Sequence, residues 1–169
     1  MWGAPSAGKS TAAAGLFYKM KSAGYNVELI SEYAKDLVWE GRTYLMKDQL
    51  YLLAKQNRKL ERLRHKVDWC ITDSPILLVL AYMPEDYYEG FEHLTSSIWK
   101  SYDNVNFLIN RHHDFEQNGR AHTQEQSSAI DQKILEIFAK YSVDYAPVNS
   151  YDAVDDIFDI IARVKKAHT

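Results

Sequence analysis

The nine residues from Gly3 to Thr11 constrain this chain more than any other part of its sequence. They read Gly-Ala-Pro-Ser-Ala-Gly-Lys-Ser-Thr and match the pattern G-x-x-x-x-G-K-[ST] at every fixed position. Glycines allow a backbone to wrap closely around a phosphate group, so that successive N–H groups converge on its oxygens. The helix expected to follow adds the positive end of its dipole. The segment therefore predicts a loop that binds the phosphates of a nucleoside triphosphate.

Two side chains of this loop have the chemistry that a bound triphosphate needs. Lys9 can reach the β- and γ-phosphates as a mobile positive charge, and the Ser10 hydroxyl can ligate Mg²⁺. The alternative is a chance turn of small residues before a helix. We predict ATP and Mg²⁺ as cofactors, with the nucleotide held by Gly3, Ala4, Pro5, Ser6, Ala7, Gly8, Lys9, Ser10 and Thr11.

Length and composition narrow the class of protein. The 169 residues, 46% of them apolar, predict a single domain over residues 1–169 with a substantial core. A net charge of −3 argues against a protein that coats nucleic acid. The single cysteine, Cys70, excludes a disulfide framework and a cysteine-rich zinc site. The longest apolar run, residues 76–82, is far shorter than the roughly 20 residues of a membrane span, and no leader pattern is present. We therefore expect a cytoplasmic protein with no membrane partner.

Short β-favouring runs alternate with longer helical patterns along the chain, which indicates an α/β fold with a mainly parallel sheet. Strands are expected at residues 25–30, 68–72, 104–110 and 144–148. Helices are expected at residues 10–23, 32–40, 47–66 and 126–141 and around 154–164. Only Met1 and Trp2 precede Gly3, whereas a central strand needs about five residues. Either the chain begins late or its central strand is a stub.

Two acids follow predicted strands. Asp73 would stand at the carboxyl edge of its strand, beside the phosphate loop, where ligands bind in open α/β sheets. A carboxylate there can hold Mg²⁺ or accept a proton from an attacking hydroxyl. Glu32 occupies the same position after residues 25–30 and could orient or deprotonate a substrate hydroxyl. The structural alternatives are helix capping for Asp73 and a favourable first-turn position for Glu32.

A polar segment follows the strand expected at residues 104–110. Residues 111–122 contain Arg111, Arg120, two histidines and an Asn-Gly turn signal, and a helix is expected after them. Such a segment suits a lid that closes over phosphates, because phosphoryl transfer needs cations and the exclusion of water. An ordinary solvated loop has a similar composition.

Aromatic and basic residues gather in the segments expected opposite the phosphate loop. Trp39 and several tyrosines there could stack on a base, although such residues more often complete a core. Gln49 and Gln56 could read a base edge. Between Lys47 and Lys66, seven basic residues stand against two acids. This excess indicates either a solvated helix face or contact with a polyanionic substrate.

Taken in order, the phosphate loop, Glu32-Tyr33-Ala34, Asp73-Ser74-Pro75 and the Arg111/Arg120 segment resemble a known family. The chain resembles the small P-loop kinases related to nicotinamide-riboside kinase domains and to nucleoside and nucleotide kinases. It is more closely similar to ATPase/kinase-like proteins of bacteriophages. The resemblance implies a P-loop NTPase fold, with a doubly wound parallel sheet flanked by helices and a lid segment. It also implies host cytoplasm as the location if a bacteriophage encodes the protein.

The resemblance assigns Glu32 to the substrate, Asp73 to the metal or the catalytic base, and Arg111 with Arg120 to the lid. The chain departs from the family's pattern at its nearly absent first strand. It also departs at Asp-Ser-Pro, where many nucleoside kinases have an acid followed by arginine.

The resulting hypothesis is an ATP-dependent kinase that phosphorylates a hydroxyl of a nucleoside, a nucleotide or a modified base. Lys9, Asp73, Glu32, Arg120 and Arg111 would be catalytic, Ser10 and Asp73 would hold the metal, and either Glu32 or Asp73 would be the base. A variant places the acceptor, a hydroxymethylpyrimidine of the 5-hydroxymethyluracil type, in phage DNA. A regulatory ATPase switched by nucleotide is a different alternative. The sequence lacks the Asn-Lys-x-Asp guanine reader that a GTPase would show after a strand.

Overall fold

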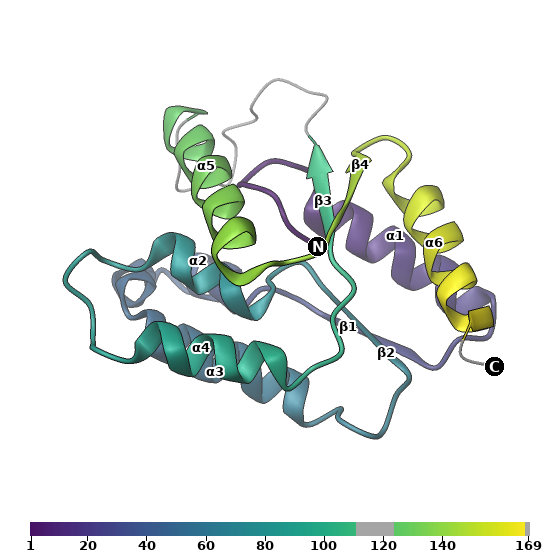
Figure 1. Ribbon diagram of the computed structural model, residues 1–169, viewed down its shortest axis with the longest axis horizontal. Helices are drawn as coiled ribbons and strands as arrows, with labels where there is room; N and C mark the ends of the chain where they lie inside the picture. The colour runs from purple at the N-terminus through teal and green to yellow at the C-terminus, as the bar shows by residue number, and fades with distance from the viewer. Residues whose placement is uncertain (111–123, 168–169) are drawn as a thin grey trace.

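The computed structural model describes the backbone of residues 1–110 and 124–167 (Figure 1). Helices and short strands alternate along the chain, as the sequence predicts. The elements are α1 (Lys9–Ser22), β1 (Val27–Ile30), α2 (Tyr33–Trp39), the 3₁₀ helix η1 (Thr43–Lys47), α3 (Gln49–Glu61), β2 (Trp69–Thr72), the 3₁₀ helix η2 (Ile76–Tyr82), α4 (Phe91–Lys100), β3 (Phe107–Asn110), α5 (Gln124–Tyr141), β4 (Ala146–Asn149) and α6 (Ala153–Ala167).

The strands form two small parallel sheets. Strand β1 pairs with β2, from Val27 opposite Trp69 to Ile30 opposite Thr72. Strand β3 pairs with β4 in the same parallel sense. The parallel α/β class is therefore confirmed, but the regular strand pairs are those of two small sheets rather than the single doubly wound sheet of the prediction.

Met1 and Trp2 lie between the two sheets and hydrogen-bond to both. The Met1 ammonium donates to the Thr72 carbonyl at 2.7 Å. The Trp2 N–H donates to the Phe107 carbonyl at 2.7 Å, and the Trp2 carbonyl accepts from the Ile109 N–H at 2.9 Å. Met1 and Trp2 thus occupy the position of a central strand and place the start of the phosphate loop between β2 and β3.

Apolar residues pack on both faces of the strands. On one face, α1 and α6 pack together and cover buried residues such as Val27, Phe107 and Ile109. On the other, η2 and α5 pack around the fully buried Trp2, whose ring meets that of Phe138 edge to face, 4.9 Å between centroids. A third cluster joins η2 to α3 and α4. Helices thus cover the strands from two sides (Figure 1).

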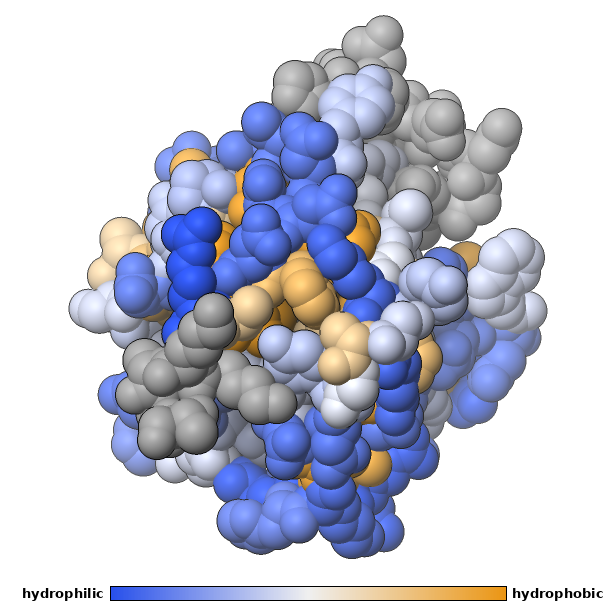
Figure 2. Space-filling model, turned by 90° about the vertical axis from the view of Figure 1, so that its right-hand side faces the viewer, coloured by the Kyte–Doolittle hydropathy of each residue, from blue (hydrophilic) through white to orange (hydrophobic). Residues whose placement is uncertain are grey.

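Figure 2 shows the molecule from the side on which α6 lies in Figure 1. Apolar residues reach the surface in the middle of this face and are surrounded by hydrophilic residues. None of the described helices combines the length and the apolar character that a membrane-spanning segment requires.

Several element boundaries differ from the predictions. The helix expected at residues 47–66 begins at Gln49, where the Asp48 carboxylate caps it by accepting from the Tyr51 N–H at 3.0 Å, and it ends at Glu61. The residues after Pro75 form the 3₁₀ helix η2 rather than an α-helix, and the pattern of α4 was not recognised. The predicted lid, residues 111–122, lies outside the described residues.

Candidate nucleotide and acceptor site

The predicted phosphate loop has the backbone conformation that its glycines permit. Gly3 and Gly8 have φ angles of 137° and 86°, in the region that favours glycine. A Cβ on Gly3 would lie 3.0 Å from the Ala7 Cβ and 3.1 Å from the Ile109 carbonyl oxygen, so a side chain has no room there. Gly8 then leads directly into α1 at Lys9. The loop therefore presents the N-terminal end of a helix of 14 residues, a favourable place for a phosphate.

The side chain of Lys9 folds back over its own loop. Its ammonium donates to the carbonyl of Gly3 at 2.6 Å and to that of Ala4 at 3.0 Å. The positive charge thus stands at the loop, where a triphosphate would require it.

Asp73 connects the loop to the ends of the two paired strands. Its Oδ2 accepts from the Ser10 hydroxyl at 2.6 Å, and its Oδ1 accepts from the backbone N–H of Glu32 at 3.0 Å. Only 4% of Asp73 is exposed, so these hydrogen bonds satisfy a carboxylate that is almost completely buried. The parallel pairing of β1 with β2 explains the arrangement, because Glu32 and Asp73 both follow strand ends at the same edge.

The donor set at Ser10 and Asp73 fits Mg²⁺. A hydroxyl and a carboxylate oxygen within hydrogen-bond distance of each other are hard oxygen ligands. Mg²⁺ typically takes only one or two protein ligands and completes its shell with water and substrate phosphates. Among the described residues there is no group of three or more His, Cys, Asp or Glu side chains that could hold a metal without such help.

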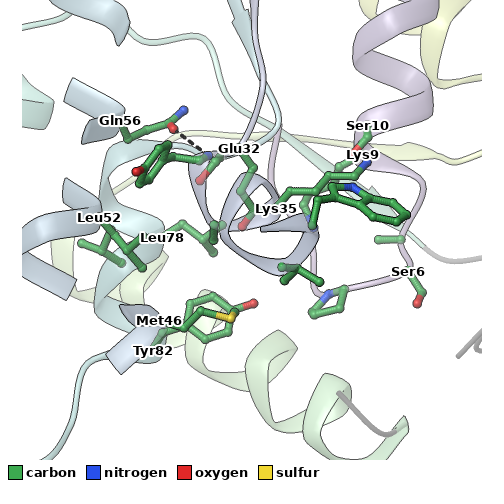
Figure 3. Close-up of a pocket in the computed structure, with 18 of the residues that line it drawn as sticks. Ser6, Lys9, Ser10, Glu32, Lys35, Met46, Leu52, Gln56, Leu78 and Tyr82 are labelled. Atoms are coloured by element: carbon green, nitrogen blue, oxygen red, sulfur yellow. Dashed lines mark hydrogen bonds between the residues drawn. The ribbon is translucent and has the colours of Figure 1, made fainter. Parts of the chain in front are cut away.

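Glu32 is the acid that faces the open part of the site. Burial raises the pKa of its carboxyl above the ordinary value of 4.5; the nearby Lys9 opposes this effect and Asp73 adds to it. In Figure 3 its side chain lies between the loop and the apolar side chains of the opposite wall. A carboxylate with a raised pKa is a better proton acceptor than an exposed one.

A single cavity of about 600 Å³ connects the phosphate loop with this wall. Residues 5–11 line one side of it, with Glu32 and Lys35 between the two sides (Figure 3). Helices α2, α3, η1 and η2 supply the opposite side, which includes Val38, Trp39, Met46, Leu52, Leu78 and Tyr82. The cavity therefore offers an apolar and aromatic space for a second molecule beside the phosphate loop.

Gln56 of α3 connects the apolar wall of the cavity to strand β2 through hydrogen bonds. Its side-chain oxygen accepts from the Tyr33 N–H at 3.3 Å, and its amide nitrogen donates to the Thr72 hydroxyl at 3.2 Å. Both polar ends of this buried side chain are thus engaged, which makes Gln56 a structural link between α2, α3 and β2 more than a reader of a base edge. Gln49 is also buried, and its amide donates to the Met46 carbonyl at 2.7 Å.

The structure brings together four of the side chains predicted for the site, namely Lys9, Ser10, Glu32 and Asp73. Arg111 and Arg120 lie outside the described residues. Asp131 of α5, which accepts from the Ala4 N–H at 3.0 Å, was missed. No local pattern marks it, because it stands 127 residues away from its partner.

A phosphate loop at a helix N-terminus, flanked by acids from parallel strand ends, defines a nucleotide-binding domain of the P-loop type. Comparison with known families agrees: residues 1–155 match the family described as AAA domain, and the chain belongs to that family. Membership supports nucleotide binding and an activity of the ATPase or kinase type. A search of the curated proteins found no match.

Proposed function

We propose that this protein is an ATP-dependent kinase that transfers the γ-phosphate to a hydroxyl of a nucleoside, a nucleotide or a modified base. The observation that carries the proposal is the continuous cavity between the phosphate loop and an apolar, aromatic wall. Hydrolysis needs only water next to the γ-phosphate, whereas transfer needs room for an acceptor. A space of about 600 Å³ is in the range of small-molecule sites.

In this proposal the loop amides and Lys9 hold the phosphates. Ser10 and Asp73 would hold Mg²⁺, which neutralises charge on the phosphates when it is bound. Both oxygens of Asp73 already accept hydrogen bonds, and Glu32 rather than Asp73 lines the cavity. These contacts support Glu32 as the base.

The reaction is a displacement at phosphorus. The acceptor oxygen forms a bond to the γ-phosphorus while the bond from that phosphorus to the bridging oxygen of the leaving ADP breaks. The acceptor proton passes to the Glu32 carboxylate. Arg111 and Arg120 keep the charge-stabilising role that the resemblance implies, and Arg120→Ala is expected to lower kcat about 10³-fold.

The test is to incubate the purified protein with γ-labelled ATP and Mg²⁺ and to offer separate acceptors. Nucleosides, mononucleotides and oligonucleotides that contain a hydroxymethylpyrimidine form the panel. We expect label to move to one class and Lys9→Ala to abolish the transfer. Lys19→Ala removes a lysine of the same helix whose ammonium pairs with Asp155, and it should leave transfer intact.

Steady ATP hydrolysis with no labelled acceptor would instead establish a regulatory ATPase. Label confined to the hydroxymethyl oligonucleotides would select the variant that acts on modified DNA.

A further inference from the structure

A row of exposed aromatic and basic side chains begins at the mouth of the cavity. Trp39 lines the cavity and yet is 77% exposed, and Tyr44 of η1 is 70% exposed. From there the row continues along α3 through Lys55 and Arg58 to Arg62, the residue that follows the last turn of α3, and all three are exposed. We call these five residues the aromatic–basic track.

Contacts between side chains join the two parts of the track. The Arg42 side chain interacts with those of Tyr44 and Tyr51. The pKa of Tyr51 is lowered mainly by its hydrogen bond with Tyr33 and further by the Arg42 guanidinium. The Tyr51 and Tyr33 hydroxyls are 2.7 Å apart. The Lys55 ammonium lies 5.3 Å from the centroid of the Tyr51 ring and 5.7 Å from that of Tyr33. Arg42 and Tyr51 thus connect the Tyr44 end of the track with Lys55.

The cations of the track are not neutralised by carboxylates of the described chain. Lys59 pairs with Asp36, and Arg64 pairs with Glu61. Within the described residues, Lys55, Arg58 and Arg62 have no such ion pair. Their spacing places them on one face of the helix, where like charges repel one another. A face that keeps three neighbouring cations without counter-charges suits a partner with several negative charges in a row.

The exposed rings narrow the choice of polyanion. A single-stranded nucleic acid combines regularly spaced phosphates with bases whose faces are free to stack, and proteins bind it with cationic grooves and aromatic platforms. A duplex offers phosphates but keeps its bases stacked. The net charge of −3 does not oppose local binding, because Asp155, Asp156 and Asp159 lie on α6, across the molecule from α3 (Figure 1).

We propose that the aromatic–basic track binds single-stranded nucleic acid, with phosphates along Lys55, Arg58 and Arg62 and a base stacked on Trp39 at the cavity mouth. Binding itself does not depend on phosphoryl transfer. Only the last step, in which the strand delivers a hydroxyl to Glu32, rests on the proposed kinase function.

The test is fluorescence anisotropy of labelled single-stranded DNA and RNA oligonucleotides with the full chain, over a salt range of about 50 to 200 mM. Arg58→Ala/Arg62→Ala should weaken binding and lower the slope of log K against log salt by about 1.4, since each phosphate contact on a single strand contributes about 0.7. Trp39→Ala should weaken binding on the order of 10-fold and leave that slope unchanged.

The matched control is Lys100→Ala/Lys133→Ala, which removes two exposed cations of α4 and α5. It changes the net charge by the same amount and should leave both affinity and slope as in the unaltered chain. A duplex of the same sequence should bind more weakly than the single strand. The proposal would be overturned if the two double variants lost equal amounts of affinity for the single strand. It would also be overturned if the unaltered chain bound no oligonucleotide at the lowest salt concentration.

Transfer assays separate this proposal from the kinase function. A chain that binds the oligonucleotide as expected but phosphorylates no acceptor would refute the kinase and leave the track established. A chain that phosphorylates free nucleosides but binds no oligonucleotide would establish the kinase function and refute the proposed role of the track.

Discussion

The carboxylate of Asp131, on α5, accepts a hydrogen bond from the backbone N–H of Ala4, the second residue of the phosphate loop, at 3.0 Å. Ala4 is completely buried, and its carbonyl accepts from the Lys9 ammonium at 3.0 Å. One residue, Ala4, thus lies between a helix that begins at Gln124 and the lysine expected to bind the triphosphate. This contact fixes the start of the loop from the side of α5.

Replacing Asp131 tests this anchoring. Asp131→Ala leaves the buried Ala4 N–H without its partner, at a cost of about 1–2 kcal/mol, and should weaken the binding of an ATP analogue about 5- to 30-fold. Asp131→Asn keeps an oxygen that can accept the bond and should retain most of the affinity. Calorimetric titration measures both. Equal affinities for the two variants would show that the hydrogen bond does not position the loop.

Asp73 offers a second test, of its role as a metal ligand. Asp73→Asn keeps an acceptor for the Glu32 N–H but removes the negative charge next to Ser10. We expect the Mg²⁺ concentration for half-maximal activity to rise about 10- to 100-fold. Asp68→Asn removes an exposed carboxylate just before β2 and is the matched control. If both variants show the same Mg²⁺ dependence as the unaltered chain, Asp73 is not a metal ligand.

Glu32 predicts a dependence of activity on pH. A base must be ionised, and burial raises the pKa of Glu32 above 4.5, so kcat should rise with pH through that higher value. Glu32→Gln should lower kcat about 10²- to 10⁴-fold and remove this dependence from the activity that remains. A pH–rate profile that is unchanged in Glu32→Gln would assign the base to another group.

The same carboxyl also affects stability. Because its pKa is raised in the folded state, its contribution is most favourable below the unfolded pKa and is lost as the pH rises through the folded value. Glu32→Gln should therefore resist urea better than the unaltered chain at neutral pH. The advantage should disappear below about pH 4.5. If the greater urea resistance of Glu32→Gln did not change with pH, the raised pKa of Glu32 would not be its cause.

Gly15 tests the packing of α1 against α6. A Cβ at this position would lie 2.8 Å from Cγ2 of Val154. Gly15→Ala should therefore destabilise the protein by about 1–3 kcal/mol despite its better helix propensity. In a Val154→Ala background the same change should stabilise it by up to about 1 kcal/mol, because the clash is removed and only propensity remains. Urea denaturation of the four chains measures the reversal, and the same sign in both backgrounds would disprove it.

The sequence predicted the parts of the site that short-range rules determine. The spacing of the glycines and Lys9 specifies the loop, and acids after β-favouring runs are brought to one edge once the strands pair in parallel. The structure adds contacts that no local pattern encodes. The hydrogen bond from the Glu32 N–H to Asp73 depends on the register of β1 and β2, and that from Ala4 to Asp131 on the packing of α5.

The misjudged elements have physical causes as well. Pro75 has an extended ψ of 148°, and the apolar run after it is buried between α3, α4 and α5, where packing selects a 3₁₀ helix. The helical pattern over residues 47–66 continues past Glu61, but Arg64 instead turns back to bind Glu61 and the Ser101 carbonyl. Local propensity cannot anticipate either result, because distant residues determine both.

The hydrogen bonds between Lys9 and its own loop have an energetic consequence. Two carbonyl oxygens already accept hydrogen bonds from the Lys9 ammonium, so a nucleotide that binds there must replace them. Capture is therefore an exchange of partners, and the net affinity reflects the difference between phosphate and carbonyl as acceptors. The same two hydrogen bonds also tie the start of the loop to the first residue of α1, so the lysine contributes to the shape of the loop to which it belongs.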